Sequence, residues 1–416
     1  MKIAFYNLIL RGLAIAGRFV VLIGIGRYLS ETDLGIYGLF YSTIVLSIYF
    51  IGLDFYTFST REIIAAKGTD RLTFIRNQFA FHLYSYLIIL PILLPVFFYD
   101  ILPVRYMLWF YIVLIFNHLS QEFIRIFIAL SRSIFANFIS FVHSGLWVFV
   151  LAVFWILDFG FLINLETILI FWGAASVTAF LVALAYLKFA LKEPLPGTKV
   201  NWTWIRQGLF TAMPFFVGSV CYKIIEHSNR YFIDFFQGRD LVGIFTFYAG
   251  IANIVSVLVN TAIIIIAYPK LYELFISRNW EQYNIEKRKF FRNVLLMSVA
   301  SGLILLLMID PLIALIGKSD TFQPNLSSFY LLVLANVILN ISLIPHFILY
   351  VQKKDLAIMF STLAGMLLNV VLNYFLIKSN SIDGAAVSMI GSFLIIAIVK
   401  FYFVLTSPIP AASAGN

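Results

Sequence analysis

Five ionisable side chains fall within one otherwise apolar stretch of the chain: Lys223, Glu226, His227, Arg230 and Asp234. At about 100° per residue they share an arc of roughly 100° on a helix. The bases could bind an anionic group, the carboxylates could carry a proton or sodium ion, and the histidine could relay a proton or act as a hydrogen-bonded spacer. Because their signs alternate at spacings of three or four, the same side chains could instead form a structural ladder of ion pairs.

The composition shows what kind of helix must hold this charged face. Of 416 residues, 62% are hydrophobic and 12% are charged, and the mean hydropathy is +0.96. A soluble domain is about 25% charged, so the whole chain is expected to be a polytopic membrane protein. A charge at the bilayer centre costs about 2.5–3.5 kcal/mol. The face must therefore meet protein or water, which indicates transport rather than a simple anchor.

Apolar runs of about 20 residues predict an all-α protein with about twelve transmembrane helices. The seventh contains the charged face, and without it the basic cluster of 270–292 would move outside, against the positive-inside rule. The same rule predicts cytoplasmic N- and C-termini. The expected spans are 5–28, 34–57, 78–98, 106–128, 137–157, 166–187, 209–236, 241–267, 293–310, 327–350, 356–377 and 384–405.

The segment 270–292 mixes apolar residues such as Leu271, Trp280 and Phe290 with many charges. This pattern predicts an amphipathic helix lying on the cytoplasmic surface. Its simplest role is to set the topology. Attraction of anionic lipid, or coupling of two halves of the molecule, is the alternative.

A short internal repeat divides the chain. Asp33-Leu34-Gly35-Ile36-Tyr37 follows the first span, and Asp240-Leu241-Val242-Gly243-Ile244-Phe245 follows the seventh with one inserted residue. The repeat predicts two parallel six-helix lobes, 1–190 and 209–416, joined by a cytoplasmic linker at 191–208. Many secondary transporters are built from two such halves with the substrate site between them.

Three stretches carry a family resemblance: Gly17–Phe19, Leu29–Tyr37 and Gly52–Glu62. They resemble the O-antigen flippase (Wzx-type) family of the multidrug/oligosaccharidyl-lipid/polysaccharide exporter superfamily. The likeness covers the whole chain in span number and twofold layout. Only the first sixty residues and the turn near residue 240 are specific.

The resemblance implies a multi-pass protein of the bacterial inner membrane, with two six-helix repeats around a central cavity. Such a flippase moves an undecaprenyl-diphosphate-linked oligosaccharide, for example an O-antigen repeat unit, from the cytoplasmic to the periplasmic leaflet by ion-coupled alternating access. It would need no cofactor and no nucleic acid. Its expected partners are membrane lipid, a polysaccharide polymerase and a chain-length regulator.

A diphosphate substrate calls for arginine or lysine inside the membrane. Arg18 and Arg230 are the first choices, followed by Lys223, Arg11 and Arg125. If the repeat is real, the first and seventh spans are equivalent and their basic faces would meet. Arg11 could instead snorkel to the inner headgroups.

The acidic candidates for ion coupling or gating are Asp54, Glu122, Glu226 and Asp234. Asp54 lies near the inner end of the second span, where it could carry the coupling ion or pair with Arg61. Glu122 and Arg125, at i and i+3 in the fourth span, are expected to form a gate or interface pair.

Absent motifs and short loops argue against other classes. The chain has no phosphate-binding G-x-x-x-x-G-K-[ST] loop, no H-E-x-x-H and no G-x-S-x-G, and its single cysteine, Cys221, excludes an intrachain disulfide. We therefore expect a transporter rather than an enzyme. An ion-coupled multidrug exporter of the same superfamily is the first alternative, and a membrane polysaccharide polymerase is the second.

Overall fold

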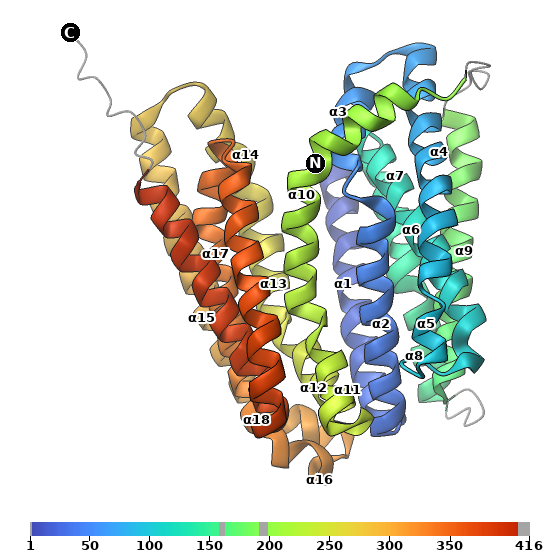
Figure 1. The fold of residues 1–416 in the computed structure, drawn as a ribbon, viewed down its shortest axis with the longest axis vertical. Coiled ribbons are helices and arrows are strands. Elements are labelled where there is room, and N and C mark those ends of the chain that lie inside the picture. The colour runs from blue at the N-terminus through green and yellow to red at the C-terminus, as the bar shows by residue number, and fades with distance from the viewer. Residues whose placement is uncertain (1, 158–162, 191–198, 407–416) are drawn as a thin grey trace. The chain divides into compact units, whose positions relative to one another are not determined.

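The computed structural model of the chain describes residues 2–157, 163–190 and 199–406. Within these ranges every regular element is a helix (Figure 1). The prediction of an all-α protein is confirmed. The helices group into two compact units, residues 1–219 and 220–416.

The first unit is built from long helices joined by short turns. The π turn η2 (Val142–Leu146) joins two of them into one continuous span. The helices are α1 (Lys2–Tyr28), α2 (Glu31–Gly52), α3 (Tyr56–Ala65), α4 (Gly68–Ile92), α5 (Pro95–Phe98), α6 (Met107–Ala129), α7 (Ser133–Phe141), α8 (Trp147–Ile156), α9 (Leu165–Ala190) and the first part of α10 (Trp202–His227), with the short η1 (Val104–Tyr106) before α6.

The second unit takes the end of α10 and all later helices. Its own π turn, η4 (Asn260–Ile264), lies within the eighth span. The elements are α11 (Asn229–Gln237), α12 (Arg239–Ala252), α13 (Ile254–Val259), α14 (Ile265–Ile276), α15 (Trp280–Ile316), α16 (Ser319–Phe322), η5 (Gln323–Asn325), α17 (Leu326–Val351) and α18 (Asp355–Leu405).

The helices account for the expected spans. In the described residues, ten helical segments are long and apolar enough to cross a membrane. The longest, α18, has 51 residues and contains non-helical backbone at Asn380 and Ser381, so it comprises the predicted spans 356–377 and 384–405. The first predicted span corresponds to α1. The arrangement therefore agrees with about twelve transmembrane helices.

The turns flanking α2 show how local sequence sets the helix boundaries. The Ser30 side chain accepts a hydrogen bond from the backbone N–H of Asp33 at 3.1 Å and caps the helix start. At the other end Leu53 and Asp54 adopt left-handed backbone angles, with φ of 45° and 48°. A helix does not continue through two such residues. The predicted span 34–57 is consequently wrong at its end, where α2 stops at Gly52 and α3 begins at Tyr56.

The expectation of a separate surface helix across 270–292 is wrong. This segment is a helical hairpin, because α14 ends at Ile276 and α15 begins at Trp280. The Asn279 side chain caps α15 by accepting from the N–H of Gln282 at 3.2 Å. The apolar residues of the hairpin pack against protein. Leu271, Tyr283 and Phe290 are buried in one core cluster with Ile348 and Val351 of α17.

The two compact units divide inside α10, between residues 219 and 220. Near the start of α10, Trp204 and Ile205 pack with Phe55, Phe58 and Phe81, which fixes this part of the helix to the first unit. The predicted lobes 1–190 and 209–416 remain a prediction. Residues 191–198 of the predicted linker lie outside the described residues.

Candidate functional site

A buried polar cluster joins α4 and α6 of the first unit. On α4, Gln78 and His82 are four residues apart, and on α6 His118 and Glu122 have the same spacing, so each pair occupies one helix face. His82 and Glu122 are each 1% exposed and His118 is fully buried. Polar side chains buried this deeply need partners, and these helices supply them to one another.

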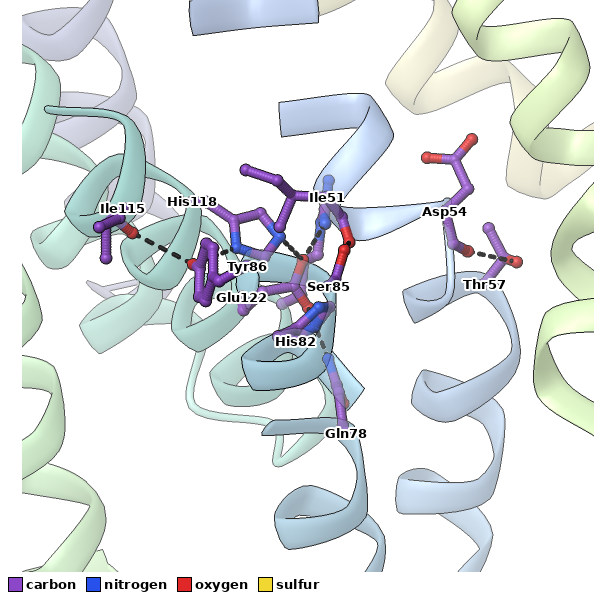
Figure 2. Close-up of polar contacts among 11 residues, drawn as sticks. Ile51, Asp54, Thr57, Gln78, His82, Ser85, Tyr86, Ile115, His118 and Glu122 are labelled. Carbon is purple, nitrogen blue, oxygen red and sulfur yellow. Dashed lines mark hydrogen bonds and ion pairs between the residues drawn. The ribbon is translucent and has the colours of Figure 1, made fainter. Parts of the chain in front are cut away.

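Glu122 is the centre of the cluster (Figure 2). Its Oε2 accepts a hydrogen bond from Gln78 Nε2 at 2.5 Å and lies 3.3 Å from His82 Nε2. Its Oε1 forms an ion pair with Arg125 and lies 3.8 Å from His118 Nε2. One carboxylate is therefore surrounded by a guanidinium, an amide and two imidazoles.

Further contacts fix the orientation of these groups. The Tyr86 hydroxyl and His118 Nδ1 share a hydrogen bond of 2.6 Å. The Arg125 guanidinium stacks on the ring of Tyr56 in α3, with Cζ 3.7 Å from the ring centroid, and the Arg125 side chain is 27% exposed. Arg125 is thus the member of the cluster that reaches its edge.

The cluster offers ligand atoms for a cation and a carboxylate for a proton. Ligand atoms of His82, His118 and Glu122 lie within 4.8 Å of one another, the spacing of a shared ion. Arg125 already places a positive charge on the same carboxylate, however. A divalent metal would be repelled at that distance, so the arrangement suits a proton better than a metal.

Asp54 stands apart from the Glu122 cluster, as Figure 2 shows. It is 4% exposed, and its backbone carbonyl accepts a hydrogen bond from the Thr57 hydroxyl at 2.8 Å. Among the described residues it forms no ion pair with Arg61, which is exposed. Its role in carrying an ion stays a prediction.

The bases predicted on the first span lie on α1. Arg18 is exposed on the helix surface. Its neighbour Gly17 is buried where the backbones of α1 and Gly145 of η2 approach closely, and a Cβ at Gly17 would lie 3.0 Å from the Gly145 Cα. The side chain of Arg11 lies outside the described residues.

In the second unit the charged face is split by a break at Ser228. Lys223 and Glu226 pair at 2.5 Å at the end of α10. Beyond the break, Asp234 of α11 pairs at 3.6 Å with Arg239, the first residue of α12. The predicted ladder is therefore formed in part within one helix, and its last acid pairs across a turn.

Arg230 is buried at the start of α11. Its Nε donates to the Thr246 hydroxyl at 3.0 Å and its Nη1 donates to the Glu226 carbonyl at 3.1 Å. Its guanidinium also lies over the ring of Phe245 at 5.5 Å. These contacts hold the guanidinium in a defined orientation.

Sequence reasoning missed two sets of polar residues. His82 and His118 of the Glu122 cluster carry a weak signal, the i,i+4 spacing to Gln78 and Glu122. The second set is Lys400 and His346: Lys400 is 4% exposed within α18, and its Nζ lies 3.3 Å from His346 Nδ1 of α17. The position of Lys400 inside a long apolar run is the sequence signal that could have indicated its burial.

Comparisons with known proteins agree with this architecture. The family model described as "Polysaccharide biosynthesis protein" matches residues 2–275. A comparison with curated protein sequences finds no match.

Two solved structures resemble the chain over nearly its whole length. An inward-facing multidrug resistance MATE family transporter of the MOP superfamily has a TM-score of 0.73 at 14% identity, covering 95% of this chain and 97% of that one. The lipid II flippase MurJ, in an inward closed conformation, has a TM-score of 0.72 at 13% identity, covering 97% and 88%. At these identities the likeness establishes the fold alone.

Proposed function

Because this chain belongs to the polysaccharide biosynthesis protein family, we propose that it is a flippase for a lipid-linked oligosaccharide. The substrate would be an undecaprenyl-diphosphate-linked unit such as an O-antigen repeat. The protein would move it from the cytoplasmic to the periplasmic leaflet of a bacterial inner membrane by ion-coupled alternating access. A polysaccharide polymerase and a chain-length regulator would act beside it. The transporter fold and the many apolar helices support this proposal.

The exposure of Arg18 is the observation that carries the proposal. Arg18 lies well inside α1, a helix of 27 residues that corresponds to the first span. Because a charge in the apolar core of a bilayer is costly, an exposed arginine there faces a polar space. An arginine that faces such a space suits a diphosphate, since its planar fork binds phosphate oxygens in pairs.

Arg230 is proposed as the second diphosphate contact, with Lys223, Arg11 and Arg125 as further candidates. The bonds from Arg230 to Thr246 and to the Glu226 carbonyl orient its guanidinium in advance. An orientation fixed before binding lowers the entropy lost on binding. Glu226, Asp234, Asp54 and Glu122 remain proposed ion-coupling or gating residues.

The test is genetic complementation combined with localisation of intermediates. Deletion of the gene should leave lipid-linked oligosaccharide on the cytoplasmic side. Arg18→Ala or Arg230→Ala should fail to restore surface polysaccharide, at least a tenfold loss, because each removes a charge-assisted contact of about 1.5–3 kcal/mol. Arg230→Lys should retain part of the activity, since it keeps the charge but not the fork. Full complementation by both well-expressed alanine variants would refute the diphosphate assignment.

The same experiment separates the alternatives. The likeness to a multidrug resistance transporter favours drug export as a second candidate, which predicts drug sensitivity and normal surface polysaccharide in the deletion strain. A polymerase would instead leave single repeat units on the periplasmic side.

A further inference from the structure

The Glu122 cluster has one feature that a purely structural ion pair would not need. Its single acid is shared between a guanidinium on one side and two imidazoles on the other. Glu122, His82 and His118 are almost completely buried, whereas Arg125 is 27% exposed. The cation that neutralises the acid is thus the one member that an external anion can reach.

Glu122 is buried, so a proton can neutralise it in place of the Arg125 guanidinium, whereas a hydrated ion is too large to enter. The Glu122 Oε2 and His82 Nε2 are 3.3 Å apart, so the imidazole lies directly against the carboxylate. The other ring nitrogen of His82, Nδ1, has no hydrogen-bond partner in the described part of the chain. If Arg125 moved away, the carboxylate would stay buried without its cation, a state that costs several kcal/mol.

The surroundings leave Arg125 as the only full positive charge near Glu122 among the described residues. The remaining ionisable groups facing the pair are histidines, tyrosines and one acid. They are Tyr49 of α2, Asp54 of the following turn, Tyr56 of α3, His82 and Tyr86 of α4 and His118 of α6. None of these can supply the lost cation without taking up a proton.

We propose that an anionic diphosphate draws Arg125 away from Glu122, and that Glu122 takes up one proton in its place. This inference rests on the proposed flippase function and adds a protonation step to its substrate binding. The proton comes from water and forms one bond, to a carboxylate oxygen of Glu122, while the Arg125 ion pair is exchanged for a guanidinium–phosphate contact. Binding of substrate and uptake of a proton are then one event.

Direct measurement of proton uptake tests the proposal. Purified protein in weakly buffered detergent solution is titrated with farnesyl diphosphate, and binding and pH are followed together. The wild type should take up about one proton per bound molecule, so each rise of one pH unit should weaken binding about tenfold beyond the probe's own ionisation. Glu122→Gln should still bind and should lose this uptake and its pH dependence.

The controls make each outcome informative. Glu286→Gln removes another acid held by two bases, Lys270 at 3.1 Å and Lys289 at 2.9 Å, and should leave the proton count unchanged. If Glu122→Gln does not fold, infrared difference spectra of the wild type still report whether a buried carboxylate gains a proton on binding. Binding without proton uptake overturns the coupling alone. No binding of farnesyl diphosphate overturns the coupling and the proposed diphosphate recognition together.

Discussion

The two units each bury charge between a pair of long helices, but they balance it differently. In the first unit Glu122 on α6 is neutralised by Arg125 and contacted by two imidazoles and an amide. In the second unit Lys400 on α18 meets only the imidazole of His346 on α17, and no carboxylate pairs with it in the described residues. A balanced cluster changes state only when a competing ion arrives. A lone buried base can change state by releasing its own proton.

The largest effect should come from unbalancing the first cluster. Arg125→Ala leaves the buried Glu122 without its cation and should cost about 3–5 kcal/mol of unfolding free energy. The loss should shrink as the pH falls, because a proton can then replace the missing guanidinium. Thermal unfolding in detergent at several pH values measures both effects.

The double variant Arg125→Ala with Glu122→Gln is the matched control for that prediction. It removes both charges and should recover most of the stability. A single variant as stable as the wild type at neutral pH would mean that the cluster is not held by charge balance.

A smaller loss of unfolding free energy is expected when the hydrogen bond between Tyr86 and His118 of the same cluster is removed. Tyr86→Phe deletes the hydroxyl that bonds His118 Nδ1 at 2.6 Å and leaves a buried nitrogen unsatisfied. The expected cost is about 1–3 kcal/mol, measured by the same unfolding assay. Tyr99→Phe, at a tyrosine that is 81% exposed, should change nothing. Equal effects of the two variants would refute the role of this bond.

The smallest effect should come from the second unit. Lys400→Met removes a buried base without leaving an acid behind, so stability should stay within about 1 kcal/mol of the wild type or rise. Lys378→Met on the exposed part of α18 serves as the comparison. A large loss for Lys400→Met alone would show that this lysine is held as firmly as Arg125, and the contrast between the units would disappear.

The sequence predicted what depends on one helix at a time. Hydropathy and the positive-inside rule placed the spans, including the seventh despite its charges. The pairs Glu122–Arg125 and Lys223–Glu226 follow from spacings of three on a helix. The 270–292 hairpin was missed because its apolar residues fit a lipid surface and the α17 core equally well.

Contacts between side chains on different helices could not be predicted from the sequence. Nothing in the spacing of His82 indicates that it meets Glu122, which is forty residues away on another helix. The burial of Lys400 against His346 likewise depends on how α17 and α18 pack. The pairing of Asp234 with Arg239 depends on the turn at Gly238, where φ is 91°.

The sequence separation of these partners bears on how the chain enters the membrane during synthesis. Glu122 with Arg125, and Lys223 with Glu226, are each three residues apart, so each helix can cross the insertion machinery as a nearly neutral segment. Lys400 and His346 are 54 residues apart. The end of α18 must therefore enter the bilayer with a lysine that has no polar partner, unless α17 is already next to it at that moment.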